Sequence, residues 1–441
     1  MKWLRPIHVL CACLVVLGIV GQTTAQDAAP EAAQDAAPTF LDQVDLTPLD
    51  EVAVYTQGRL KSFESFVREL MQFVTGGKSI DGHPLGVTYF DLMFRSSLYA
   101  DKDFIYVKMK LMRYEISDAL LKSVREDIDK TDFARVSPGV NREMMENHYA
   151  DLEARMEIFR DTGLVSPQVL LDPTVDDVLR RMSTDLMRTA SKVTALDTAM
   201  SIRRPDILRA NFMAIASTES DDDPWFGPDQ LRQVVSMRDA TPEELAVIDA
   251  WTAFSSAWMS EDAAGVNAAA RQLADALPMV NPGVYPEQGR LAAESWYFKA
   301  PAWAGGRNMV GVWLYYALAF VPLLLSVVFR WRGAHWIGMA IFLAAFALHT
   351  AAILLRWYVA QRWPNTNMFE AVTTAAWFGG CFAVLAEAFL WRMPLRGLIA
   401  LGSAGASAVA MMAAKFMPTY LNPNISNRMP VLHDLWLYIH T

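Results

Sequence analysis

The chain has 441 residues, of which 53% are hydrophobic and 11% aromatic, enough for more than one packed domain. Its formal charge of -9 argues against a nucleic-acid partner, which would call for a basic patch. Cys11 and Cys13 lie near the N-terminus, and Cys381 lies in a late apolar segment. Residues 14–380 contain no cysteine, which excludes a disulfide framework and a Cys-x-x-Cys redox pair in this region.

The first 25 residues are typical of a secretory signal peptide. Lys2 and Arg5 precede a short apolar run at 9–20, and the small residues of Thr23–Ala25 suit cleavage. An uncleaved anchor helix is the alternative, although the run is short for a bilayer span. Both interpretations place the following residues outside the cytoplasm.

A linker and a helical domain are expected next. Residues 26–39 repeat Gln-Asp-Ala-Ala-Pro with almost no large apolar side chain, which predicts a disordered linker. Residues 40–304 show helical spacing of apolar residues, as in 63–74, and predict an exported helical domain. Thr241 and Glu244 form a capping-box pattern at the start of one helix. We find no phosphate loop and no nucleophile or metalloprotease motif in this region, so we expect a scaffold.

Residues 305–441 predict a polytopic α-helical membrane domain, so the expected fold class is mainly α. Arginines between the first and second apolar segments, and between the third and fourth, indicate that these two loops are cytoplasmic. The loop 356–367 and everything after Lys415 would then lie on the outer side, as would the exported domain. The segments long enough to span a bilayer are about Met309–Phe329, His335–Leu355, Met368–Leu390 and Leu398–Ala414.

Three ionisable residues near the second span are candidate binding residues. His349 lies inside the span, where a neutral imidazole could bind a metal or haem iron, or could hydrogen-bond a neighbouring helix. Arg356 and Arg362 lie in the expected outer loop, where the charge rule predicts few cations. They could pair with the carboxylates of a ligand or anchor the chain at the interface.

Two further histidines, His433 and His440, lie seven residues apart near the end of the sequence. Two helical turns would bring them to one face. Trp436 and Tyr438 between them could sit at the membrane interface, so a flat apolar ligand could lie beside an axial imidazole. A structural role for this pair is the alternative.

Two stretches resemble the System II cytochrome c biogenesis proteins of the CcsA/ResC type, in particular the fused CcsBA form. The first is His349-Thr...Arg356-Trp-Tyr...Arg362-Trp-Pro-Asn-Thr-Asn367-Met-Phe-Glu370-Ala...Trp377, which is similar to the family's outer loop and following helix. The second is Met429-Pro...Trp436-Leu-Tyr-Ile-His440, similar to a segment that ends in a haem-ligating histidine. Trp363, Phe369, Ala371 and Asp434 depart from the usual residues.

A third, more diffuse resemblance links the two ends of the expected exported domain. Gln57-Gly-Arg-Leu-Lys61 and Glu294-Ser-Trp-Tyr297 look like elements that precede the membrane part in fused homologues. The family's Trp-rich haem-binding motif and its second outer histidine would follow His440, and this sequence ends at Thr441. The resemblance therefore predicts a membrane domain incomplete at its C-terminus, from a fragment or a split gene product.

The resemblance implies haem b carried outward and presented for thioether attachment to the Cys-x-x-Cys-His of apocytochrome c. His440 would be an axial ligand of the iron beside Trp436, and His349 would bind haem in transit. Arg356 and Arg362 would pair with the propionates, and Asn367 and Glu370 would brace the loop.

The family's setting is the bacterial inner membrane, with the large N-terminal domain in the periplasm. The implied partners are a ResB/CcsB-like protein or the missing C-terminal half, a thiol reductase system and membrane lipid. The chain would then be part of a cytochrome c haem lyase. The residues leave two alternatives open: a polytopic transporter or sensor with an exported ligand-binding domain, and a scaffold that recruits apocytochrome.

Overall fold

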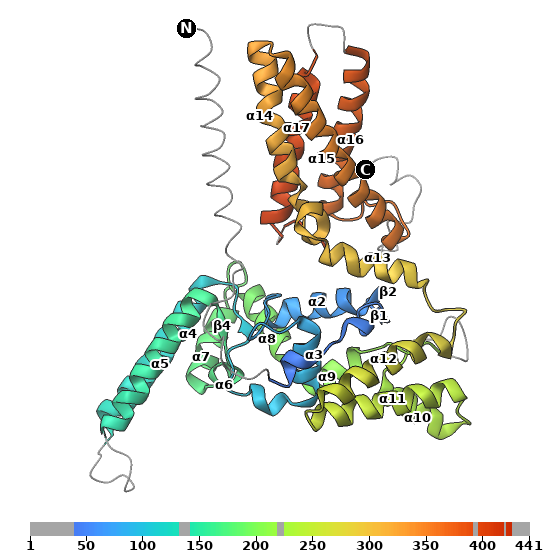
Figure 1. Cartoon of the computed structure of the whole chain (residues 1–441). Coiled ribbons are helices and arrows are strands. Elements are labelled where there is room, and N and C mark those ends of the chain that lie inside the picture. Colours follow the sequence, from blue (N-terminus) through green and yellow to red (C-terminus); the bar gives the residue numbers. More distant parts are fainter. Residues whose placement is uncertain (1–38, 132–141, 218–224, 391–395, 419, 426–441) are drawn as a thin grey trace.

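The computed structural model describes residues 39–131, 142–217, 225–390, 396–418 and 420–425. Within these residues the chain is mainly helical, with two short two-stranded sheets, which confirms the predicted fold class. Figure 1 shows an upright bundle of long helices above a larger N-terminal assembly, with one helix, α13, crossing between them. The expected signal peptide lies outside the described residues, as does the expected linker except Thr39.

The elements of the N-terminal part are helical apart from two small hairpins. Its strands are β1 (Ala53–Thr56), β2 (Arg59–Ser62), β3 (Ile105–Tyr106) and β4 (Leu164–Val165). Its α-helices are α2 (Phe63–Val74), α3 (Leu85–Phe94), α4 (Lys110–Lys130), α5 (Arg142–Thr162), α6 (Pro167–Leu170), α7 (Pro173–Ser183), α8 (Ala190–Ile202), α9 (Pro205–Asn211), α10 (Pro228–Met237), α11 (Pro242–Met259), α12 (Ala263–Val280) and α13 (Gln288–Lys299). Short 3₁₀ turns are η2 (Leu41–Gln43), η3 (Thr47–Leu49), η4 (Ser96–Tyr99), η5 (Ala302–Ala304) and η6 (Arg307–Val312).

The ends of several helices follow from their local sequence. Ser62 caps α2, and the helix stops before Gly76 and Gly77, which both have positive φ, as expected for glycine after a helix. The capping box of Thr241 and Glu244 is confirmed at the start of α11. Helix α12 then packs back against α11, as the apolar pattern indicates.

One buried carboxylate organises the aromatic core of the N-terminal part. Asp91 on α3 accepts hydrogen bonds from the Trp258 indole at 2.9 Å and the Tyr99 hydroxyl at 2.8 Å. It also pairs with Arg95 Nε at 2.6 Å. Each polar group is therefore satisfied inside a core of phenylalanine and tryptophan rings, which a buried charge requires.

The C-terminal part of the chain forms the helical bundle. Among the described residues, it contains four helices that are long and apolar enough to cross a membrane. Helix α14 packs against both α15 and α17, and α16 packs against α17. Gly338 on α15 allows the close approach to α14, since an added Cβ would lie 2.9 Å from the backbone N of Leu323. The helices are α14 (Trp313–Phe329), α15 (Arg332–Ala360), α16 (Met368–Leu390) and α17 (Leu398–Phe416).

Helix α15 is longer than the sequence suggested. The expected span ended at Leu355, with Arg356 in the following loop, whereas α15 continues to Ala360 and buries Arg356 to 1% exposure. The connection to α16 is correspondingly shorter. The physical reason is that Arg356 is fully paired within the protein, as described below, so its charge does not force the helix to end.

Candidate functional site

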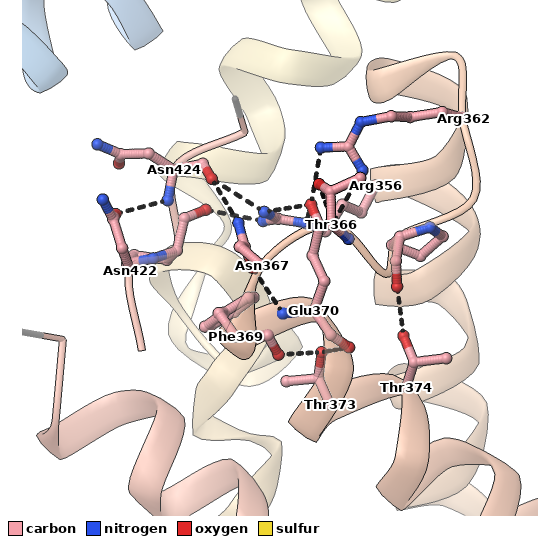
Figure 2. A network of polar contacts seen from close by, with 12 residues as sticks. Arg356, Arg362, Thr366, Asn367, Phe369, Glu370, Thr373, Thr374, Asn422 and Asn424 are labelled. Atoms are coloured by element: carbon pink, nitrogen blue, oxygen red, sulfur yellow. Dashed lines mark hydrogen bonds and ion pairs between the residues drawn. The ribbon is translucent and has the colours of Figure 1, made fainter. Parts of the chain in front are cut away.

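The carboxylate of Glu370 is the centre of a buried polar network at the end of the bundle next to α13 (Figure 2). Its oxygens accept from Arg356 Nε at 2.9 Å and from Arg362 Nη1 at 2.8 Å. The backbone N and hydroxyl of Thr366 donate to the same group at 2.8 and 2.9 Å. Glu370 is completely buried, so these contacts replace the water that an ionised carboxylate needs.

Arg356 uses its whole guanidinium in protein contacts. Besides Glu370, it donates to the Tyr297 hydroxyl at 3.3 Å and to the carbonyl oxygens of Pro423 and Asn424 at 2.8 and 3.2 Å. Its Nη2 lies 2.8 Å from Glu370 Oε1, so each of the five N–H donors has an acceptor. In this arrangement Arg356 ties α13, α15, α16 and the segment after α17 together, and has no donor left for a ligand.

Asn367 fixes the start of α16. Its side-chain oxygen accepts from the backbone N of Glu370 at 2.8 Å, and its amide donates to the Asn424 carbonyl at 3.2 Å. The first contact is that of a helix N-cap, so the motif spacing from Asn367 to Glu370 has a direct local cause. The structure thus brings together four residues singled out in the sequence, namely Arg356, Arg362, Asn367 and Glu370.

The network carries two arginines against one carboxylate, a formal excess of one positive charge. The Arg362 side chain is 8% exposed, against 1% for Arg356, so it is the more accessible cation. The backbone carbonyls that Arg356 contacts offset part of its charge. Electrostatically, this end of the bundle suits an anionic group better than a cationic one.

His349 lies deeper in the bundle, on the same helix as Arg356, and is fully buried. Its Nδ1 is 3.1 Å from the hydroxyl of Tyr316 on α14. His349 also lines a small cavity of about 10 Å³. A porphyrin needs a site of a few hundred Å³, so this arrangement has no room for haem beside His349.

Helix α13 connects the network to the N-terminal part. One turn before Tyr297, Glu294 pairs with Arg59 of the β1–β2 hairpin and accepts from the backbone N of Ser62 at 3.2 Å. The two stretches of the diffuse family resemblance, at 57–61 and 294–297, therefore lie against each other. Nearby, burial lowers the pKa of Lys61, which pairs with Glu69.

Other predicted site residues cannot be placed. His440 and Trp436 lie outside the described residues, and so does His433. Their roles stay predictions from the sequence.

Three residues of this region have no site role among those expected from the sequence. Tyr297 and Tyr316 contact Arg356 and His349 directly, and Asn308 borders the cavity beside them. A tyrosine or asparagine near an apolar span was an available signal, because a buried polar group needs a partner. The partner itself could not be read from the sequence, since each contact joins separate elements.

The comparisons with known proteins give one partial similarity. No protein-family model matches the chain. Over 129 residues, 28% of this chain, the sequence is 32% identical to Protein NrfI of Wolinella succinogenes. The matched part is 12% of that relative, so the chain spans a small fraction of its length.

Proposed function

We propose that this chain takes part in cytochrome c assembly, as part of a membrane protein that presents haem for attachment to apocytochrome c. The observation that carries the proposal is the convergence of Arg356, Arg362, Asn367 and Glu370 in one buried network. These residues belong to the sequence stretch 349–377 that resembles the CcsA/ResC type. The similarity to Protein NrfI, though partial, agrees with it.

Haem b is the cargo in this proposal, held by residues on the outer side of the bacterial inner membrane. His440 would bind the iron, with Trp436 against the porphyrin. Arg362, the more accessible cation of the network, would attract a propionate, since arginine suits bidentate pairing with a carboxylate. Arg356 would act indirectly, because its contacts with Glu370, Pro423 and Asn424 hold the segment that leads toward His440.

His349 could bind haem iron only in a more open arrangement of the helices. Iron could reach its Nε2 only after the surrounding helices separate, because the cavity there is smaller than a porphyrin. The closed arrangement would then alternate with an open one during haem passage. The partners of the assembly would be apocytochrome c, a ResB/CcsB-like protein or further sequence that completes the haem lyase, a thiol reductase and membrane lipid.

The test is haem copurification with a matched pair of histidine variants. The protein is purified from membranes, and its haem absorption band is recorded before and after reduction. His440→Gly should lower the band, and added imidazole should restore it, because imidazole replaces the missing ligand. His433→Gly, seven residues earlier in the same segment, should leave the band unchanged.

Two results would overturn the proposal. A wild-type protein without any haem band would favour a transporter or sensor of anionic solutes. A haem band that His440→Gly leaves intact would remove the axial role of His440.

A further inference from the structure

Exposed tryptophans mark two levels on the long helix α15. Trp336 lies near the start of the helix and Trp357 near its end, and both side chains are exposed. The two residues are 21 positions apart, which corresponds to about 31 Å at the rise of an α-helix. The hydrocarbon core of a bilayer is about 30 Å thick, and tryptophan is enriched at its two boundaries. The spacing of the two indoles therefore matches the thickness of the hydrocarbon layer.

The stretch of α15 between these indoles suits hydrocarbon. Positions 337–355 contain no aspartate, glutamate, lysine or arginine, and their one histidine, His349, is fully buried. The first charged residue after them is Arg356, directly before Trp357, and it is paired with Glu370 inside the protein. The level of Trp357 therefore coincides with the change from apolar to charged sequence.

Helix α13 lies across this end of the bundle (Figure 1). At its start, Glu287 Oε2 accepts from the hydroxyl of Tyr358, the residue after Trp357 on α15, at 3.4 Å. Beyond its other end, the Trp303 carbonyl accepts from the hydroxyl of Tyr315, at the start of α14, at 2.9 Å. The segment from α13 to Trp303 thus runs from the end of one apolar helix to the start of another, at the level that Trp357 marks.

Two large aromatic side chains of this segment are exposed. Tyr297 of α13 is buried in a cluster with residues of α15, and Leu291 is buried in a cluster with Ala53 of the β1–β2 hairpin. In contrast, Trp296 is 43% exposed and Trp303 is 65% exposed. An indole has an apolar ring and a polar N–H group, a combination suited to the layer of lipid headgroups.

We propose that α13 is an interfacial helix, which lies in the headgroup layer of the bilayer with Trp296 and Trp303 in contact with lipid. The partner is the membrane surface, continuous with the lipid around the apolar helices of the bundle. The indoles supply the contact, because Lys299 in the last turn of α13 is paired with Asp50 and Glu64. On this placement the N-terminal part is held against the membrane surface, and the Arg356–Glu370 pair lies at a boundary of the bilayer.

The test measures the depth of spin labels in the full chain, reconstituted into vesicles of phosphatidylcholine and phosphatidylglycerol. Cys11, Cys13 and Cys381 are replaced by serine, and a single cysteine is introduced for labelling by Trp296→Cys or by Trp303→Cys. Electron paramagnetic resonance then gives the accessibility of each label to oxygen, which concentrates in hydrocarbon, and to a nickel chelate, which stays in water.

Two further labels calibrate the depth. Leu343→Cys reports the hydrocarbon layer, because Leu343 is exposed and lies between the two indoles of α15. Met187→Cys reports water, because Met187 is 93% exposed in the N-terminal part. For the labels at Trp296 and Trp303, we expect a ratio of oxygen to nickel accessibility between these two references.

A third label tests the role of the indoles themselves. Ala302→Cys, at an exposed position beside Trp303, leaves both indoles in place and should give the same intermediate ratio. Adding Trp296→Ser and Trp303→Ser should shift its ratio toward that of Met187. An unchanged ratio would overturn the anchoring role of the indoles.

Two other results would overturn the placement of α13. A ratio equal to that of Met187 would place the helix in water. Low accessibility to both oxygen and nickel would show that protein, and not lipid, covers the indoles. The measurement needs no haem, so its outcome is independent of the haem absorption of the His440 variants.

Discussion

Glu370 and Arg356, 14 residues apart in the chain, form a buried ion pair that holds the end of α15 against the start of α16. Neither side chain exposes more than 1% of its surface. A second cation, Arg362, shares the same carboxylate, so the loop between the two helices is fixed from both ends.

Glu370→Gln should destabilise the bundle strongly. The change leaves Arg356 and Arg362 without their anion, and breaking a buried pair in this way costs about 3–5 kcal/mol. Thermal unfolding in detergent, followed by tryptophan fluorescence, should show a much lower midpoint. Glu261→Gln is the control, because Glu261 pairs with Arg95 but is 59% exposed. Equal midpoints for both variants would contradict the central role of Glu370.

Arg356→Lys should destabilise the contacts of the segment after α17. Lysine cannot reproduce the planar set of donors that reaches Glu370 and the carbonyl oxygens of Pro423 and Asn424. Loss of these bonds should cost ~1–3 kcal/mol and expose the segment. Hydrogen exchange at 420–425 should accelerate. Arg332→Lys, at the exposed opposite end of α15, should leave this exchange unchanged.

Gly338→Ala should disturb the contact between α14 and α15. A Cβ at this position would lie 2.7 Å from Leu323 Cγ and 2.9 Å from its backbone N, so the helices must move apart. Overpacking of this kind costs about 1–3 kcal/mol and should lower the unfolding midpoint. Gly402→Ala is the control, because its Cβ would meet nothing within 4 Å. A midpoint equal to that of the control would show that the helices separate freely.

Asp50→Asn should change how stability depends on pH. Burial raises the pKa of Asp50 above its ordinary value of 3.8, against the lowering effect of Lys299. Between 3.8 and the raised pKa, the folded state binds more protons than the unfolded state, so stability falls as pH rises through this window. Asparagine does not titrate, so the variant should lose this part of the fall. Identical slopes of unfolding free energy against pH would contradict the prediction.

The membrane helices were the most predictable part of the fold. Their apolar runs are long, so length and hydropathy are sufficient, and Met368–Leu390 was placed with both ends correct. The predicted end of the second span at Leu355 is wrong, because the charge of Arg356 indicates a loop residue when the sequence is taken alone. Its partner Glu370 is on the next helix, and that pairing is a property of the folded chain.

The site was predictable in its residue types and not in its geometry. The motif residues include Arg356, Arg362, Asn367 and Glu370, and the sequence leaves two roles open for the arginines, pairing with a ligand or anchoring at the interface. In the structure the donors of Arg356 are directed at protein acceptors on other elements, which the sequence does not identify. The β1–β2 hairpin was also missed, although Gln57 and Gly58, both with positive φ, form a recognisable hairpin turn.

Helix α13 carries Glu294 and Tyr297 one helical turn apart, the first bound to Arg59 and the second to Arg356. The two side chains lie on the same helical turn, so a shift of one contact also displaces the other. A tilt of the β1–β2 hairpin relative to the bundle would shift the Tyr297 hydroxyl away from Arg356. A movement of the N-terminal part relative to the bundle would therefore change the hydrogen bonding of the Arg356 guanidinium at the end of the bundle.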